Sequence, residues 1–475
     1  MNPDARSPSR PGNDAGGQSR RWQVVLGVTA FVALYRWAYI HFMATTYTSY
    51  GFDFQPVPTL FEALAWLFAI VPSLWMPIRF TRASQLAYWI LYLTVVVPSM
   101  FIPLFIGLNP PNEILPFMAT LCASFGLLGL GYRFRLHAFP ASTIGATTFW
   151  MGFAIFGTAC TLALVISFWG NMHLVSFADI YDVRQNSQDT GGALLNYALM
   201  WSYGATYPFL IAWGLYYKKP WLFVLGSLGQ VLVYACFGTK ASLLSIVFIA
   251  GLCGLFRVGR GPFPLKLLWA INAVFLVLCL IFRIEDETPD LLTLALMFLV
   301  MFRSFGLSGL LSGQYFYFFQ HNPHTYFSHL KVVNWIVHYP YHYPLGTEIG
   351  YYYYGAARVD TTAHFWATDG LAALGLPGIV VASLACAFLF WLIDSTTARH
   401  DIRLTGLVTF YATYSLANLS LFTTFISGGL GLLIFFLWAL PAREDRSMIP
   451  VPASRARSAV PNTGAPGREL SSRHA

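Results

Sequence analysis

The polar stretch FADIYDVRQNSQDTGG, residues 177–192, lies between two long apolar runs and carries residues suited to binding an anion. Tyr181 and Arg184 are three positions apart, so on one helical turn they would share a face. A guanidinium group offers a planar fork of donors that keeps its charge, which suits phosphate or carboxylate. The alternative is a solvated loop arginine paired with Asp182 or Asp189.

Two further cations stand at the edges of apolar runs. Arg303 follows LLTLALMFLVMF and precedes SFGLSGLLSGQYFYFFQ. An arginine at membrane depth costs roughly 2.5 to 3.5 kcal/mol, so it needs a partner or a cavity unless it extends to the outer headgroups. Lys240, in CFGTKASLL, is expected in a tight outer turn, where it either contributes to a site for an anionic lipid or is simply solvated.

A segment rich in aromatic residues and histidine, residues 318–370, holds most of the histidines of the chain. Histidine is the natural proton carrier near neutral pH, and aromatic faces fit sugar rings. The aromatic candidates for binding a glycan are Tyr315, Tyr326 and Trp366. The alternative is the interfacial belt of Tyr and Trp found in any membrane protein. His321 and His324 are three apart, but no HExxH motif or carboxylate–histidine cluster accompanies them, so no metal site is expected.

His364 and Asp369 are the first candidates for acid–base chemistry in this segment. They lie five residues apart, which on one helix separates their directions by about 140°. Both can serve one site only if a helix starts between them. In the competing interpretation Asp369 is the N-cap of the next membrane helix. Glu348 is a further candidate base.

These residues sit on a chain with the composition of an integral membrane protein. Of 475 residues, 56% are hydrophobic and only 10% are charged, and the mean hydropathy is +0.57. Soluble domains carry about 25% charged residues. Apolar runs such as residues 22–44 and 86–106 approach or exceed the roughly 20 residues that a helix needs to cross a bilayer, and they lack the period-two alternation of barrel strands. We therefore expect an all-α polytopic membrane protein.

The placement of basic residues predicts the topology. Lys and Arg cluster in alternate short loops, which the positive-inside rule assigns to the cytoplasm, and this explains the net charge of +8 better than nucleic-acid binding does. The apolar run 291–302 is short, so residues 291–311 are expected to form a re-entrant or interfacial helix on the outer side. About twelve crossings result, with both termini in the cytoplasm.

Three regions follow from this topology. Residues 1–21 and 441–475 are rich in Pro, Gly and Ser and are expected to be disordered cytoplasmic tails. Residues 22–440 form the membrane domain, with two functional outer loops at about 170–193 and 303–365.

Several of these stretches occur together in one family. The chain resembles the oligosaccharide repeat-unit polymerases of bacterial O-antigen and exopolysaccharide synthesis, the Wzy-type polymerases. The resemblance rests on DIYDVRQNSQ, GTKASLLSI, MFRSFGLSGLLSGQYFYFFQHNPHTYFSHL and GTEIGYYYYGAARVDTTAHFWATDGLAALGLPGIVV, within residues 177–385. An element similar to AHFWAD matches residues 363–367 and Asp369, with Thr368 inserted.

The resemblance implies a GT-C-like architecture of the polymerase and ligase type, and an activity at the periplasmic face of the bacterial inner membrane. A growing glycan on undecaprenyl diphosphate would be transferred to a new lipid-linked repeat unit, without metal or cofactor. Membrane partners would be a chain-length regulator and a flippase, and no nucleic acid. The implied diphosphate ligands are Tyr181, Arg184, Arg303 and Lys240. His364 is the implied base, with Asp369 and Glu348 in reserve.

Two other functions remain open at this point. A ligase similar to the O-antigen ligases uses the same donor with a lipid A core acceptor. A transporter or flippase of lipid-linked glycans predicts charges on helices that line a midplane cavity. Arg36 is the clearest charge deep in an apolar run, while Glu62 lies nearer a helix end. The candidate groups concentrate in outer loops, which favours an enzyme.

Overall fold

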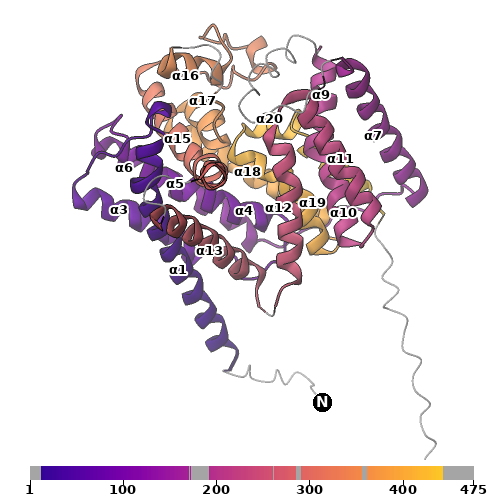
Figure 1. Cartoon of the computed structure of the whole chain (residues 1–475), viewed down its shortest axis with the longest axis horizontal. Coiled ribbons are helices and arrows are strands. Elements are labelled where there is room, and N and C mark those ends of the chain that lie inside the picture. The colour runs from indigo at the N-terminus through magenta and orange to yellow at the C-terminus, as the bar shows by residue number, and fades with distance from the viewer. Residues whose placement is uncertain are drawn as a thin grey trace, which may run out of the picture. The chain divides into compact units, whose positions relative to one another are not determined.

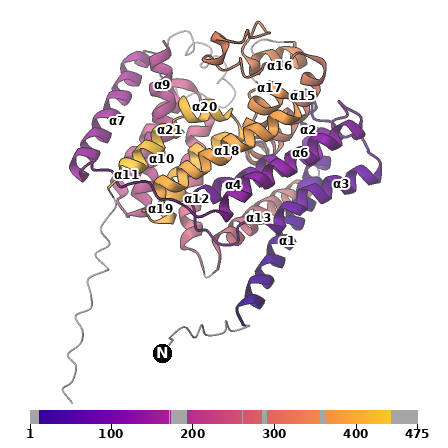
Figure 2. The ribbon, with the colours of Figure 1, turned by 180° about the vertical axis from the view of Figure 1, so that it is seen from behind.

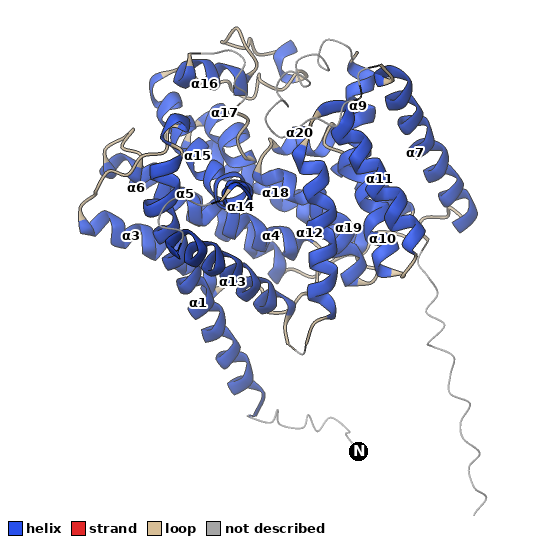
Figure 3. Ribbon diagram, in the orientation of Figure 1, coloured by secondary structure: helices blue, strands red, loops and turns tan. Residues whose placement is uncertain are grey.

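The computed structural model describes residues 12–170, 172, 192–259, 261–284, 290–355 and 361–441, which all belong to one compact unit. Within these residues every regular element is a helix, as Figure 3 shows. The all-helical fold class is thereby confirmed for the described part of the chain.

The α-helices are α1 (Gly12–Ala38), α2 (Ala44–Thr46), α3 (Thr59–Ile70), α4 (Ser84–Leu91), α5 (Val97–Phe105), α6 (Pro111–Leu130), α7 (Ala146–Phe168), α9 (Ala193–Trp201), α10 (Tyr207–Tyr216), α11 (Pro220–Phe237), α12 (Lys240–Arg257), α13 (Phe263–Ile284), α14 (Leu291–Met297), α15 (Leu307–His321), α16 (Leu345–Tyr354), α17 (Ala372–Leu374), α18 (Leu376–Thr397), α19 (Ile402–Tyr414), α20 (Leu421–Ile426) and α21 (Leu430–Ala439). The π-helical segments are η1 (Tyr39–Met43), η4 (Tyr92–Val96), η6 (Ser202–Thr206), η7 (Phe298–Gly306) and η9 (Trp366–Leu371). The 3₁₀ turns are η2 (Thr48–Tyr50), η3 (Val71–Leu74), η5 (Gly131–Arg133), η8 (Val333–Trp335) and η10 (Ser415–Ala417).

Many of these helices are suited to a membrane. Among the described residues, nine are long and apolar enough to cross one, and two shorter apolar helices accompany them. The multi-pass character is therefore supported, although the nine are fewer than the twelve crossings expected. Long helices pack side by side, as α18 does with α6 and α10 with α11 (Figures 1 and 2).

The basic turns gather at one end of the bundle. Arg21 donates to the carbonyl oxygen of Met76 at 2.6 Å, and Arg82 donates to that of Phe134 at 2.5 Å. Arg257, at the end of α12, donates to the carbonyl oxygen of Leu215 at 2.6 Å. The turn between α12 and α13 lies at the bottom of Figure 1, while α16 lies at the top. Phe80, close to Arg82 in sequence, packs against Phe256 and Phe263 with ring centroids 5.6 and 5.4 Å apart, so the basic turns of Arg82 and Arg257 lie together.

Two expected boundaries differ from the structure. Helix α1 begins at Gly12, within the stretch 1–21 that was expected to be a disordered tail. Arg21 stabilises this part of α1, because it donates hydrogen bonds to the carbonyl oxygens of Ser73 in η3 and of Met76 in the turn that follows. The segment 291–321 is one continuous helical stretch of 31 residues and a candidate span, because the apolar pattern resumes after Arg303. The predicted re-entrant helix and the loop starting at residue 303 are therefore not supported.

One close contact fixes the packing of η6. Gly204 lies so near the turn between α20 and α21 that a Cβ atom there would be 2.1 Å from the carbonyl oxygen of Gly428. Only a glycine at this position lets the two backbones approach.

Candidate functional site

Two cationic side chains converge away from the basic end. Gly238, with φ 63°, ends α11 in the left-handed region, and α12 begins two residues later with Lys240, which confirms the predicted tight turn. The Lys240 Nζ atom lies 5.8 Å from the ring centroid of Phe298. Arg303 is close enough for its charge to repel that of Lys240. Lys240 and Arg303, here called the cation pair, concentrate positive charge at one place.

The π-helical segment η7 sets the position of Arg303. Asp290 caps α14 by accepting from the Thr293 amide at 2.8 Å, and the helix then widens at Phe298. Ser304 donates to the carbonyl oxygen of Leu299, five residues earlier, which is the π spacing. Arg303 is exposed, and within the described part of the chain no carboxylate forms an ion pair with it.

The cation pair lies far from the basic end. Lys240 begins α12 and Arg257 ends it, so the 18 residues of this helix separate them by about 25 Å. Two like charges, one exposed and one partly buried, in a chain with few charges are suited to binding an anion.

A strip of aromatic rings leads from the cation pair to α16. The rings of Phe298 and Phe302 stack with centroids 4.9 Å apart, and Tyr50 packs edge-on against Phe302 at 5.0 Å. The Tyr354 hydroxyl of α16 donates to the carbonyl oxygen of Tyr50 at 2.8 Å. The ring of Tyr47 also packs against Phe302, with the two ring centroids 4.5 Å apart. Side chains from three separate parts of the chain therefore form one packed cluster, in which Phe302 and Tyr47 are buried and Tyr50 is exposed.

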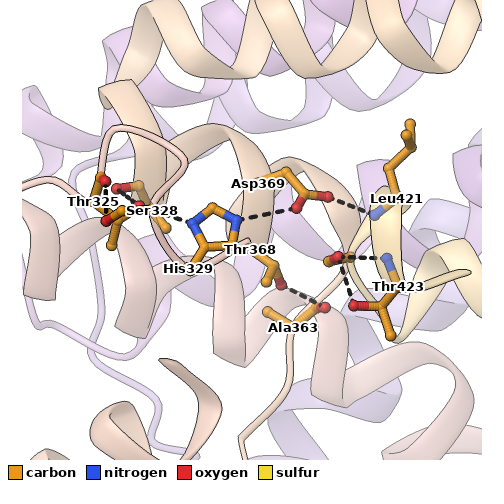
Figure 4. Close-up of polar contacts among 10 residues, drawn as sticks. Thr325, Ser328, His329, Ala363, Thr368, Asp369, Leu421 and Thr423 are labelled. Carbon is orange, nitrogen blue, oxygen red and sulfur yellow. Dashed lines mark hydrogen bonds and ion pairs between the residues drawn. The ribbon is translucent and has the colours of Figure 1, made fainter. Parts of the chain in front are cut away.

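A histidine that no sequence motif indicates binds Asp369. His329 Nε2 donates to Asp369 Oδ1 at 3.3 Å, and the two side chains are only 7% and 1% exposed (Figure 4). The other ring nitrogen, Nδ1, lies 2.8 Å from the Thr325 hydroxyl, which also donates to the Ala372 carbonyl oxygen. Each hydrogen in this network has its own acceptor when both nitrogens of His329 are protonated.

Asp369 also binds a third element. Its Oδ2 atom accepts from the Leu421 amide at the start of α20 at 2.5 Å. Asp369 lies inside η9 and α18 begins only after Gly375, so the predicted N-cap for the next membrane helix is wrong. Asp369 instead links three parts of the chain. Its own segment is η9, His329 connects it to the segment after α15, and the Leu421 amide connects it to α20. This joint of His329, Asp369 and Leu421 is here called the clamp.

The π-helical η9 accounts for the inserted Thr368. A π-helix accommodates one more residue per turn than an α-helix does. The Thr368 hydroxyl donates to the carbonyl oxygen of Ala363, five residues earlier, at 2.7 Å (Figure 4). The helix starts at Phe365, so His364 lies just before the helix that carries Asp369.

His364 occupies the interior and not an open site. It is buried, with Nε2 2.6 Å from the Ser312 hydroxyl and Nδ1 accepting from the Ala367 amide at 3.3 Å. Burial lowers the pKa of His364 to about 3. Both ring nitrogens have partners, and His364 does not contact Asp369 through any hydrogen bond of the described residues. This placement does not favour His364 as the base.

The remaining predicted residues differ in how exposed their side chains are. Glu348 lies in the first turn of α16, partly exposed, and Oε2 accepts from the Tyr343 amide at 3.2 Å. Tyr315 and Trp366 are buried, which excludes them as stacking platforms for a sugar, whereas Tyr326 is exposed on a left-handed turn with φ 49°. Tyr181 and Arg184 lie outside the described residues.

The charge that suggested a transport pathway has a partner. Arg36 Nε donates to Glu62 Oε1 on α3 at 2.5 Å. The pair is explained as a joint between α1 and α3, so it does not by itself indicate a transport pathway. Among the described residues no group of three His, Cys, Asp or Glu is placed to hold a metal ion.

Two residues of the site, His329 and Tyr50, are not among those predicted from the sequence. His329 belongs to the segment rich in histidine, but no spacing rule links it to Asp369, 40 residues later. Tyr50 follows the first apolar run, residues 22–44. Comparison of the chain with protein-family models, with curated proteins and with solved structures gives no match.

Proposed function

We propose that the protein polymerises oligosaccharide repeat units linked to undecaprenyl diphosphate, at the outer face of the bacterial cytoplasmic membrane. The observation that carries the proposal is the cation pair, the exposed Arg303 and the partly buried Lys240, at the opposite end of α12 from the basic turns. If the basic end is cytoplasmic, the cation pair lies toward the outer side. The resemblance to Wzy-type polymerases points to the same orientation.

The proposed chemistry needs stabilisation of a leaving group. The acceptor hydroxyl oxygen forms a bond to the anomeric carbon as the bond from that carbon to the diphosphate oxygen breaks, and the acceptor proton goes to a base. Negative charge grows on the diphosphate, and cations fixed in advance at that point lower the barrier. Lys240 and Arg303 are assigned this role, with Arg184 as a further ligand.

The three candidate bases differ in how accessible they are to a substrate. His364 and Asp369 are enclosed by their partners, whereas Glu348 is partly exposed on α16, the helix that reaches the aromatic strip. Glu348 is therefore the preferred base of the three candidates. Alignment of the acceptor next to it supplies the remaining rate enhancement.

The test is the profile of lipid-linked glycan from cells that lack the protein, complemented with variants at matched expression. We expect single repeat units without the protein and a full ladder with wild type. Arg303→Ala should lower polymerisation on the order of 10²-fold, since one stabilising donor is lost. Arg303→Lys should keep part of the activity. Lys331→Ala removes an exposed lysine elsewhere and is the matched control.

Other outcomes identify other functions. Long polymer that stays on the carrier lipid and never reaches its final acceptor would indicate a ligase. A ladder that is unchanged when the protein is absent would contradict the proposal and return attention to transport.

A further inference from the structure

We propose that Tyr50, Tyr343 and Tyr351, with Glu348, form a series of subsites for the sugar rings of the lipid-linked glycan. The inference rests on the proposed function for the identity of the substrate. It replaces the buried Tyr315 and Trp366 by residues whose faces are open.

Tyr50 is the subsite nearest the cation pair. Its ring is 43% exposed, yet Phe302 supports one edge at 5.0 Å and its carbonyl oxygen is held by the Tyr354 hydroxyl. Gly51, with φ 87°, ends the 3₁₀ turn in the left-handed region and fixes the direction of the chain after Tyr50. Tyr50 is thus an exposed ring on a rigid support.

Tyr343 and Tyr351 form the second subsite. Their ring centroids are 6.0 Å apart at an angle of 43°, and the side chains are 42% and 51% exposed. Glu348 anchors this pair by accepting from the Tyr343 amide, and the Tyr339 hydroxyl donates to the Tyr343 carbonyl oxygen at 3.0 Å. Burial, together with the charge of Glu348, raises the pKa of Tyr339. The carboxylate therefore faces the tyrosines.

The two subsites lie on one path. Tyr351 and Tyr354 are three residues apart and share a face of α16, and Tyr354 contacts Tyr50. A chain of contacts connects Lys240 to Tyr50 through Phe298 and the buried Phe302, in steps of 5.8, 4.9 and 5.0 Å, and fixes how far apart the cation pair and the Tyr50 ring lie. A diphosphate at the cation pair would place the donor sugar at Tyr50 and the acceptor sugar at α16, beside Glu348, the preferred base.

The chemistry of this surface fits a sugar better than lipid. A sugar ring has an apolar C–H face that stacks on an aromatic ring and a rim of hydroxyl groups that need acceptors. A carboxylate stands beside the second subsite, where Glu348 accepts from the Tyr343 amide, and the exposed Asp53, which accepts from Gln55 Nε2 at 3.3 Å, follows Tyr50 by three residues in the sequence. Charged carboxylates oppose burial of this surface in an apolar acyl layer.

The test measures binding of a free oligosaccharide to the full-length protein in lipid nanodiscs. The probe is the repeat-unit oligosaccharide released by mild acid from the carrier-lipid fraction of the same cells, followed by saturation-transfer NMR and calorimetry. We expect Tyr50→Ala and Tyr351→Ala to weaken binding at least ten-fold and to shorten the glycan ladder. Tyr351→Phe keeps the ring and should bind as wild type does.

The matched control is Tyr352→Ala. Tyr352 is the next residue of α16 and about as exposed, but its ring packs edge-on against Phe318 at 5.1 Å. Equal loss in Tyr352→Ala and Tyr351→Ala, or wild-type binding by both Tyr50→Ala and Tyr351→Ala, would overturn the inference. Size-exclusion profiles identify variants that fail to fold, for which Tyr351→Phe and Tyr50→Phe supply the comparison.

The two proposals fail separately. If the ladder depends on Arg303 while the tyrosine variants bind and polymerise as wild type does, the subsites are wrong and the polymerase stands. If the oligosaccharide binds through Tyr50 and Tyr351 while cells lacking the protein make a normal ladder, the polymerase is wrong and the glycan site stands.

Discussion

Replacing Asp369 by alanine should destabilise the protein strongly, because two buried groups lose their partner at once. The Leu421 amide and His329 Nε2 both donate to this carboxylate, which is only 1% exposed. A buried donor without an acceptor costs about 1 to 3 kcal/mol. Two such donors give about 4 kcal/mol, within the roughly 3 to 5 kcal/mol expected when one partner of a buried pair is removed.

Asparagine at the same position should cost much less. Its carbonyl oxygen can accept from the Leu421 amide, while its NH₂ group donates to His329 Nε2 once the proton of His329 resides on Nδ1. The Thr325 hydroxyl then accepts from Nδ1 and still donates to the carbonyl oxygen of Ala372. Every hydrogen bond is retained and only the charge is lost, so we expect about 1 kcal/mol.

The assay is thermal unfolding in detergent, followed by tryptophan fluorescence, for wild type, Asp369→Asn and Asp369→Ala. Hydrogen exchange provides a local measure, since the amides of Thr325 and Tyr326 donate to the carbonyl oxygens of Ala372 and Ala373. We expect these amides to lose protection first in Asp369→Ala. Equal unfolding temperatures for the asparagine and alanine variants would refute this account of the clamp.

Three further predictions concern packing, the pair between α1 and α3, and pH. Gly204→Ala should cost about 1 to 3 kcal/mol by overpacking, whereas Gly152→Ala, with open space around it, should be neutral or stabilising in the same melting assay. Glu62→Gln leaves Arg36 without its partner, so it should destabilise the protein more than the double variant that also carries Arg36→Gln. A double-mutant cycle measures this difference. An unfolded histidine titrates near pH 6.5 while the folded His364 does not, so stability falls as the pH drops below 6.5. The loss from this residue is about 2 kcal/mol at pH 5, and His364→Gln should remove it from the pH dependence of melting.

The sequence predicts the membrane helices well because their signal is local. Apolar runs of sufficient length can be read from the sequence alone, and nine helices among the described residues are long and apolar enough to cross a membrane, although twelve crossings were expected. The continuous helix across Arg303 is harder to predict, because a single charge at the end of a short apolar run resembles a boundary. An exposed arginine in a π-helical turn interrupts neither the backbone nor the apolar face.

The site was harder to predict because its contacts are not local. His329 and Asp369, or Tyr50 and Tyr354, meet only after distant segments pack, and no spacing rule links them. Burial of His364 also depends on α15, which supplies Ser312. Residue type indicates which chemistry is available, but only packing decides which side chains are exposed to a substrate.

The π-helical turn that contains Thr368 has a consequence for comparison among related chains. A π-turn absorbs one extra residue without changing the direction of the helix that follows, so deleting this residue would restore an α-helical turn and leave the later part of the helix in register. The length of this segment can therefore differ by one residue between chains that keep the same packing beyond it. In a set of relatives, chains with and without the extra residue should both retain the histidine that binds the aspartate.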